Sequence, residues 1–145
     1  MKEIKELVRL DAMCFDPPVN YTIGEMEYYL LRPSSVLFRK FQDQRMVAFC
    51  LGNMADGNIV TIDVHPRYRR RGYGKILLQQ IIDKFSRHNV KEAVSQVAID
   101  NLPSVMLHKN FGFEIRAVMY GYYPDGRAAF EMALPLRREK LHMKS

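Results

Sequence analysis

The chain has 145 residues, of which 48% are apolar, so it can form one domain with its own core and is not disordered as a whole. A formal net charge of +6 suits an anionic partner, such as a phosphorylated cofactor, a nucleic acid or an acidic protein surface. No apolar run approaches the ~18 residues of a membrane span, and we expect no secretory signal. Cys14 and Cys50, the two cysteines, are too few for a disulfide framework or a zinc site, which predicts a reduced, cytoplasmic protein without a metal.

Hydrophobic spacing and turn residues predict helices and strands in the order ααβββαβαββ. The predicted helices cover residues 3–15, 24–31, 76–88 and 103–110. The predicted strands cover residues 36–41, 45–51, 58–64, 93–99, 113–122 and 128–134. The last two strands form a hairpin around the turn Pro124-Asp125-Gly126. This order predicts an α+β fold, in which a mixed sheet carries helices on both faces.

The segment from Asn58 to Lys75 has the pattern of an anion-binding loop, because a strand leads through a short glycine-containing turn into a helix. Free N–H groups and the helix dipole favour an anion at such a helix start. Gly72 and Gly74 leave room for a phosphate, and the neighbouring arginines add charge. The segment lacks the third small residue of a Rossmann fingerprint and the Gly-Lys-Ser/Thr of a P-loop. On spacing alone, a solvated basic turn at a helix start also explains it.

Two segments resemble motifs of the GNAT superfamily of N-acetyltransferases. Arg69-x-x-Gly72-x-Gly74, which follows Val64-His65-Pro66, is similar to the acetyl-CoA motif of that family. The stretch Asn101-x-x-Ser104-x-x-Leu107-His108-x-x-x-Gly112-Phe113 is similar to the family's Asn-x-x-Ala-x-x-Leu-Tyr-x-x-x-Gly-Phe. The two motifs stand in the order and at the spacing that the family shows, so they support each other.

A third segment, Gly121-Tyr-Tyr-Pro-Asp-Gly126, resembles the RimI-like and archaeal N-terminal α-amine acetyltransferases. The whole resemblance covers about residues 5–134 and implies the GNAT acyl-CoA N-acyltransferase fold. That fold usually opens with a strand before its first helix. Here the predicted first helix stands almost at the start of the sequence, so we expect this strand to be short or missing.

The resemblance implies that acetyl-CoA is the co-substrate and that the acceptor amine attacks its thioester directly, without an acyl-enzyme. The backbone near Val64 would line the pantetheine arm and polarise the thioester carbonyl, and the basic loop would hold the pyrophosphate. The residues so implied in acetyl-CoA binding are Ile62, Asp63, Val64, Arg69, Arg70, Arg71, Gly72, Tyr73, Gly74, Lys75, Asn101 and His108. The side chain of Asn101 can equally cap the helix that follows it.

His108 stands where many family members carry the tyrosine that protonates the leaving thiolate. It follows Asn101 by two helical turns, so both can face one cleft, and a histidine can donate such a proton. We therefore expect His108 to be the catalytic acid, and a packing residue is the alternative. The two positions that often hold the base carry Asn58 and Gln96, and neither amide accepts a proton at neutral pH. Asp63 can be interpreted as a base, although we expect its backbone to matter more and its side chain to pair with nearby arginines.

A site without a strong base suits an α-amine, whose pKa of ~7.7–8.0 lies well below the ~10.4 of a lysine amine. We therefore expect the acceptor to be the N-terminus of a protein or peptide, held in a groove with aromatic walls. The residues expected to bind it are Tyr21, Tyr28, Gln96, Tyr122 and Tyr123. Two alternatives remain: a GNAT that acetylates a small amine (a polyamine, an amino acid or a drug), and a non-catalytic acyl-CoA-binding module.

Residues 1–136 are expected to form one GNAT domain and residues 137–145 a basic tail. A missing first strand would leave a sheet edge open to a partner chain, so we expect a monomer or a homodimer. We expect no membrane partner. Cofactor phosphates explain the arginine cluster better than a nucleic acid does, so contact of the basic tail with the ribosome is the one nucleic-acid interaction that we retain.

Overall fold

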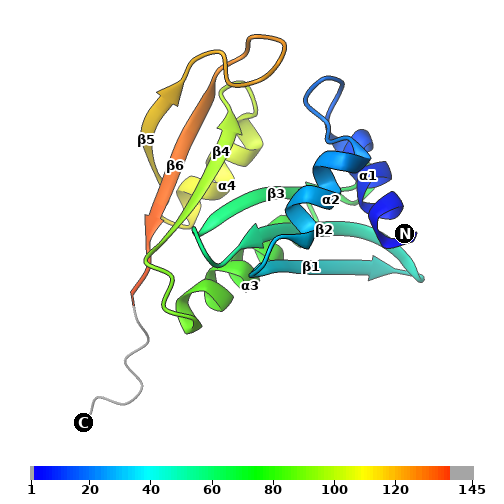
Figure 1. The fold of residues 1–145 in the computed structure, drawn as a ribbon, viewed down its shortest axis with the longest axis horizontal. Coiled ribbons are helices and arrows are strands. Elements are labelled where there is room, and N and C mark those ends of the chain that lie inside the picture. The colour runs from blue at the N-terminus through cyan, green and yellow to red at the C-terminus, as the bar shows by residue number, and fades with distance from the viewer. Residues whose placement is uncertain (1, 138–145) are drawn as a thin grey trace.

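The computed structural model describes residues 2–137, which form one mixed sheet with helices on both of its faces (Figure 1). The helices α1 (Lys2–Cys14) and α2 (Ile23–Leu31) cover one face. The helices α3 (Tyr73–Arg87) and α4 (Leu102–Asn110) cover the other. The predicted α+β fold, with helices on both faces of the sheet, is therefore confirmed.

The sheet has six strands in the spatial order β1-β2-β3-β4-β6-β5. The strands are β1 (Ser35–Gln42), β2 (Arg45–Asn53), β3 (Asn58–Val64), β4 (Glu92–Ala98), β5 (Glu114–Met119) and β6 (Ala129–Pro135). A short 3-10 helix, η1 (Pro66–Tyr68), follows β3. Neighbouring strands are antiparallel except β3 and β4, which are parallel. The predicted order of helices and strands is confirmed, and within residues 2–137 no strand precedes α1, so β1 lies at an edge.

Two predicted boundaries are wrong by a few residues. The strand predicted over 113–122 is shorter, because β5 pairs with β6 only as far as Met119 and the chain then turns at Gly121, whose φ is 65°. The helix predicted from residue 76 begins earlier, at Tyr73. Its N-cap is Gly72 at a φ of 90°, a left-handed conformation that glycine adopts without steric cost. The apolar periodicity of α3 starts one turn after the helix itself does, which is why the periodicity placed the boundary too late.

Two apolar layers hold the helices to the sheet. On the α3 side, buried residues such as Leu77, Ile81 and Phe85 pack against the sheet. On the α1 side, Leu7 and Met26 pack against the buried side chains of β2. The two layers hold α1 and α3 on opposite faces of the sheet. The side chain of each β3 residue therefore points either towards α1 or towards α3.

A bulge in the middle of β3 changes which side chains point towards which helix. Leu51 of β2 pairs with Thr61, whereas the adjacent Gly52 pairs with Ile59, so Val60 is an extra residue. One extra residue moves all following side chains to the opposite face. Ile59 accordingly packs in the layer on the α3 side, while Thr61 lies opposite Leu51, on the α1 side.

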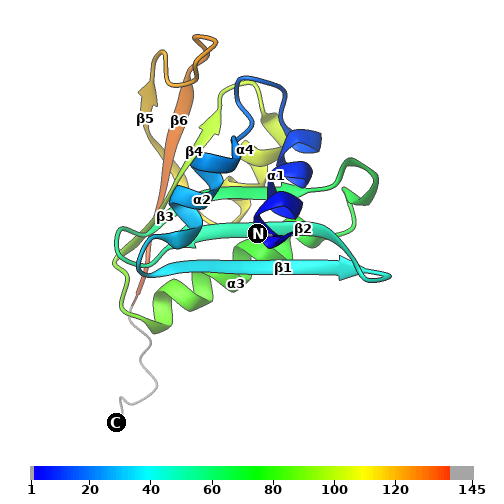
Figure 2. The same ribbon diagram turned by 45° about the vertical axis from the view of Figure 1, so that its right-hand side comes forward.

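The strands β3 and β4 separate beyond this bulge. Their parallel pairing is limited to Asn58–Val94 and Ile59–Ser95, and Figures 1 and 2 show β4 running away from β3 after that point. The sheet is thus open between its two halves at the C-terminal ends of β3 and β4. These are the ends that lead to α3 and α4, respectively.

None of the helices within residues 2–137 has both the length and the apolar character needed to cross a membrane. The division into a domain over 1–136 and a basic tail over 137–145 stays a prediction, because residues 138–145 lie outside the part of the chain that the structure describes.

Candidate active site

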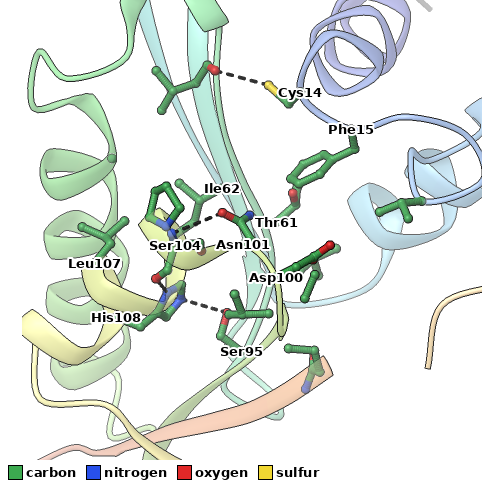
Figure 3. Close-up of a pocket in the computed structure, with 18 of the residues that line it drawn as sticks. Cys14, Phe15, Thr61, Ile62, Ser95, Asp100, Asn101, Ser104, Leu107 and His108 are labelled. Atoms are coloured by element: carbon green, nitrogen blue, oxygen red, sulfur yellow. Dashed lines mark hydrogen bonds between the residues drawn. The ribbon is translucent and has the colours of Figure 1, made fainter. Parts of the chain in front are cut away.

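A large cavity, of about 890 Å³, lies where β3 and β4 separate (Figure 3). One wall comes from residues 60–62 and 64 of β3, and the facing wall from residues 95–98 of β4. The start of α3 and one side of α4 close one end, and the loop after α1 and the loop between β5 and β6 close the other. Figures 1 and 2 show these last two loops at the same end of the molecule.

Most residues predicted to bind acetyl-CoA line this cavity. They are Ile62, Val64, Arg69, Arg70, Gly72, Tyr73, Gly74, Asn101 and His108. At the start of α3, the N-cap makes no side-chain hydrogen bond, so no side chain of the cap competes for the first N–H groups of this helix. Open space surrounds Gly72, since a Cβ built there would meet no atom within 4 Å. An anionic group can therefore approach the start of α3 closely, with arginine side chains beside it.

Three residues of the predicted acetyl-CoA set lie outside the cavity wall. The guanidinium of Arg71 lies 4.9 Å from the ring centroid of Tyr68, in a cation–π contact. Lys75 is exposed on the first turn of α3. Asp63 is buried behind the wall, with 1% of its surface exposed.

Asp63 also has other side-chain partners than the predicted arginines. Its Oδ1 accepts a hydrogen bond from the Thr61 hydroxyl at 2.5 Å, and its carboxyl faces that of Asp11 from α1. Arg69 instead donates from Nε to the carbonyl oxygen of Val64 at 3.0 Å. The prediction of an Asp63–arginine pair is thus wrong, because the bulge at Val60 turns the Asp63 side chain towards α1.

His108 lies at the end of a defined hydrogen-bond chain. Its Nδ1 lies 2.7 Å from the carbonyl oxygen of Ser104, which can only accept, so Nδ1 carries the hydrogen. Its Nε2 lies 3.0 Å from Ser95 Oγ and then accepts from that hydroxyl (Figure 3). Burial lowers the pKa of His108, which favours this neutral form.

This geometry limits what His108 can do chemically. In its neutral form, its one N–H is used by a backbone carbonyl and its lone pair by Ser95. A proton that passes between His108 and the cavity would therefore travel through the Ser95 hydroxyl. The catalytic role of His108 stays a prediction, and Ser95, which none of the sequence motifs includes, joins it at the site.

Asn101 caps the helix that follows it, as the alternative interpretation of this residue predicted. It is the N-cap of α4, and its Oδ1 accepts a hydrogen bond from the N–H of Ser104 at 3.3 Å. It also lines the cavity (Figure 3), so the cap leaves the predicted contact with acetyl-CoA open.

The acceptor end of the cavity has the predicted aromatic walls. Tyr21, Tyr122 and Tyr123 line it, together with Phe15 from the loop after α1 and Gln96 from β4. The Tyr122 and Tyr123 rings meet edge to face at 4.9 Å. Burial raises the pKa of Tyr123 to about 12, so this phenol is neutral at physiological pH.

Tyr28 does not reach this wall. It lies 63% exposed on the outer side of α2, where its ring meets that of Tyr29 edge to face at 5.1 Å. It is two positions from the buried Met26, about 200° around the helix. The predicted role of Tyr28 in acceptor binding is not tested by this placement, but the structure does not bring it together with the other residues of the groove.

Charges at the rim of the acceptor end are largely paired. Arg127 donates to Asp100 at 3.2 Å and to Asp125 at 2.8 Å, and its guanidinium lies 5.7 Å from the Tyr123 ring centroid. Asp16, in the loop after α1, is the other carboxylate on the described wall of this cavity. The groove is therefore more aromatic than acidic.

Neither cysteine has the character of a nucleophile. Cys50 is fully buried in β2, as expected for a packing residue. Cys14 lies at the cavity wall, where its thiol donates to the Val64 carbonyl at 3.3 Å, and burial raises the pKa of this thiol to about 12. Among the described residues, no group of three or more His, Cys, Asp or Glu side chains could hold a metal ion.

The fold and this cavity are those of an acyl-CoA-dependent acyltransferase, and the comparison with known families agrees. Residues 2–113 match the acetyltransferase (GNAT) family. The chain therefore belongs to the GNAT family and is an N-acetyltransferase.

The curated relatives include two archaeal N-alpha-acetyltransferases. The chain is 35% identical to that of Saccharolobus solfataricus over 94% of this chain and 89% of the relative. It is 38% identical to that of Sulfurisphaera tokodaii, over 55% of this chain and 48% of the relative, so that match spans about half of the longer protein. A bacterial relative, the ribosomal protein bS18-alanine N-acetyltransferase of Escherichia coli K12, is 32% identical over 68% of this chain and 70% of its own.

Solved structures confirm the fold. The crystal structure of the ribosomal-protein-S18-alanine N-acetyltransferase from Escherichia coli superimposes with a TM-score of 0.84 at 21% identity, covering 100% of this chain and 95% of the other. The NatC complex bound to Gag peptide and CoA contains a chain that matches with a TM-score of 0.77 at 22% identity, over 92% of this chain and 91% of the other.

Proposed function

We propose that this enzyme transfers the acetyl group of acetyl-CoA to the α-amine of a protein or peptide N-terminus. The observation that carries the proposal is a single cavity that joins an anion-accepting helix start at one end to an aromatic groove at the other. A cofactor with a long arm between its phosphates and its thioester suits the first end. An extended peptide end suits the second.

The acetyl-CoA end is supported by its chemistry. Arg69 and Arg70 line it with cationic side chains, and the open space at Gly72 allows phosphate oxygens to approach backbone N–H groups. The β3 backbone from Ile62 to Val64 would lie along the arm, in the gap that β4 leaves. The amine then attacks the thioester directly, and no metal is required for that step.

The preference for an α-amine follows from the cost of making the free amine. At pH 7 this costs a lysine amine about 4.6 kcal/mol but an α-amine only about 1.2 kcal/mol, at 1.36 kcal/mol per pKa unit. Gln96 lies on the cavity wall, where its amide cannot supply a strong base. The names of the archaeal and bacterial relatives, which describe N-terminal or alanine acetylation, support the same acceptor.

A small cationic acceptor such as a polyamine fits the groove less well. Such a ligand favours unpaired carboxylates, and of the two on the described wall Asp100 is bonded to Arg127. Paired tyrosines instead provide flat surfaces and hydroxyl groups for a peptide backbone. The groove therefore favours the peptide.

The test is free-thiol release from acetyl-CoA with three acceptors: a peptide with a free N-terminus, its N-blocked copy with one lysine, and spermidine. We expect turnover with the first alone. Turnover with spermidine alone would assign the enzyme to small amines. Binding of acetyl-CoA without turnover of any amine would identify an acyl-CoA-binding module.

We further propose that the enzyme works in the cytoplasm as a monomer or a homodimer. The two free cysteines suit a reducing compartment, and the edge strand β1 offers a surface for a second copy. Contact of the basic tail with the ribosome remains a proposal as well, and the tail lies almost wholly outside the described residues.

A further inference from the structure

Two buried carboxyl groups face each other between α1 and β3. Asp11 is fully buried and Asp63 is 1% exposed, and the two carboxyl groups are close enough for each to change the pKa of the other. They come together because Asp11 lies one turn after Leu7 on the buried face of α1, while the bulge in β3 turns Asp63 to the same side.

The four oxygens of this pair need one proton between them. Asp11 Oδ2 accepts from the N–H of Tyr21 at 2.6 Å, and Asp63 Oδ1 accepts from the Thr61 hydroxyl at 2.5 Å. The two remaining oxygens, Asp11 Oδ1 and Asp63 Oδ2, are buried without any further partner. A proton on Asp63 Oδ2, donated to Asp11 Oδ1, satisfies both, whereas two bare carboxylates at this place would repel each other.

Thr61 connects the pair to the active-site cavity. Its side chain lies on the cavity wall, where Figure 3 labels it, while both aspartates lie behind that wall. The Thr61 hydroxyl donates its hydrogen to Asp63, which leaves its oxygen lone pairs free to accept from a group in the cavity. Of the two groups that donate to the pair, the Thr61 hydroxyl can pass a proton from the cavity to it, whereas the backbone N–H of Tyr21 cannot.

Other groups on the described wall are less suited to take a proton from the amine. The lone pair of His108 is used by Ser95, and burial raises the pKa of the Cys14 thiol to about 12, so that it stays protonated. Asp100 is paired with Arg127. Asp16 is exposed to solvent in the loop after α1.

The charges around the pair set its proton affinity. Burial raises the pKa of Asp63 well above the ordinary value, with Asp11 acting in the same direction and Arg69 against it. Burial also raises the pKa of Asp11, and Glu25 of α2 adds to this. The neutral groups that face the pair from the other elements are Cys14 of α1, Cys50 of β2 and the Tyr21 phenol.

We propose that Thr61, Asp63 and Asp11 form a proton relay that removes the proton of the acceptor amine during acetyl transfer. As the amine nitrogen forms its bond to the thioester carbon, its N–H proton moves to Thr61 Oγ1 and the Thr61 hydroxyl proton moves to Asp63 Oδ1, while the proton on Asp63 Oδ2 moves on to Asp11 Oδ1, so that the pair gains one proton in all. The C–S bond breaks, and the thiolate leaves with the electron pair and takes a proton from water. Thr61 is the catalytic residue of this relay, and both aspartates act through it. This inference rests on the proposed function, because the proton that the relay removes is that of the acceptor amine.

Asp63→Asn is the sharpest test, because asparagine copies the protonated pair. Its carbonyl oxygen can accept from Thr61 and its NH₂ group can donate to Asp11, so the packing is kept while the proton can no longer be taken up. We expect kcat for the peptide to fall at least tenfold at pH 8. We expect the Kd for acetyl-CoA to stay within twofold, and the pH limb of kcat that belongs to the pair to vanish.

Thr61 variants test the relay at its cavity end, with both aspartates kept. Thr61→Val removes the hydroxyl at nearly constant shape and should match the loss of Asp63→Asn, whereas Thr61→Ser should retain most of kcat. Asp83→Asn, which removes an exposed carboxylate on α3, serves as the matched control and should change neither parameter.

The outcomes separate the relay from the proposed function. If the wild type acetylates the peptide while Asp63→Asn and Thr61→Val keep its kcat and pH profile, the relay is overturned and the proposed function stands. If the wild type acetylates no amine, both are overturned. Should Asp63→Asn fail to fold, the comparison of Thr61→Val with Thr61→Ser still decides the question.

Discussion

His108 shows how one side chain can be fixed in a single protonation state by two neighbours. The Ser104 carbonyl requires a hydrogen on Nδ1, and the Ser95 hydroxyl then requires a lone pair on Nε2. Because the protonated ring would leave the Ser95 hydrogen without an acceptor, these contacts and burial favour the neutral form together. A residue predicted as a proton donor is thus held in the geometry of a proton acceptor.

Replacing His108 by alanine should lower turnover far more than acetyl-CoA affinity. The substitution leaves the Ser95 hydroxyl without its acceptor, which should also cost about 1–3 kcal/mol of stability. Steady-state kinetics and calorimetric titration with acetyl-CoA measure the two effects separately. Ser95→Ala is the companion variant, since it breaks the same contact and keeps the ring. An equal loss of turnover and affinity in His108→Ala would make His108 a packing residue.

The buried pair predicts an unusual dependence of stability on pH. Asp63 holds its proton more tightly in the folded chain than in the unfolded one, where the pKa is ~3.9. Its contribution to stability is therefore complete below that value and is lost as the pH rises towards the raised pKa. Asp63→Asn cannot lose a proton, so its urea midpoint relative to the wild type should increase from pH 4 to pH 8. A constant difference over this range would contradict the shared proton.

The start of α3 combines a left-handed turn at Gly72 with a binding surface. Gly72→Ala would place an L side chain at a φ of 90°, with no atom within 4 Å of the new Cβ. We expect a loss of about 1–2 kcal/mol in stability from the backbone alone and a weaker affinity for acetyl-CoA. Urea unfolding and calorimetric titration measure these.

Gly126→Ala is the matched control for that prediction. Gly126 has a φ of 93° and equally open surroundings, but it lies in the loop between β5 and β6. It should show a similar loss of stability while the Kd for acetyl-CoA stays within twofold. If both variants bound acetyl-CoA equally well, the start of α3 would not be part of the cofactor site.

The elements themselves could be predicted from the sequence because periodicity and turn residues are local signals. The order of helices and strands and the loop before α3 depend on such signals. The resemblance to the GNAT family, by contrast, is what implied that Gln96 and His108 belong to one site, and both line the cavity. The Asp11–Asp63 pair could not be predicted in this way. Simple alternation along β3 puts Asp63 on the face of Ile59, and only the pairing with β2 reveals that Val60 reverses it. A signal was nevertheless present in α1, where Asp11 interrupts an apolar stripe.

The two halves of the sheet, β1-β2-β3 and β4-β6-β5, are joined weakly where β3 meets β4. β3 and β4 share two register pairs, and the rest of their length faces the cavity. A ligand that contacts both strands should therefore stabilise the protein as a unit. At a concentration of 100 times Kd, acetyl-CoA should add about 2.7 kcal/mol, which raises Tm by roughly 8 °C for a chain of this size.

Differential scanning calorimetry with and without the ligand measures this shift. Adenosine, which lacks the pyrophosphate and the pantetheine arm, is the control and should raise Tm by much less. No shift with acetyl-CoA at saturating concentration would contradict the placement of the cofactor between the half-sheets.

Because Val60 has no partner on β2, its deletion would leave Ile59 opposite Gly52 and Thr61 opposite Leu51, so the residues after it would keep their faces. If β3 instead kept Val60 and paired without the bulge, Val60 would lie opposite Leu51 and every later residue would exchange sides. Asp63 would then point into the apolar layer of α3, and Ile62 and Val64 would turn towards α1. The bulge, rather than the number of residues in the strand, thus decides whether β3 presents a threonine backed by two carboxyls or a row of aliphatic side chains to the acceptor side of the enzyme.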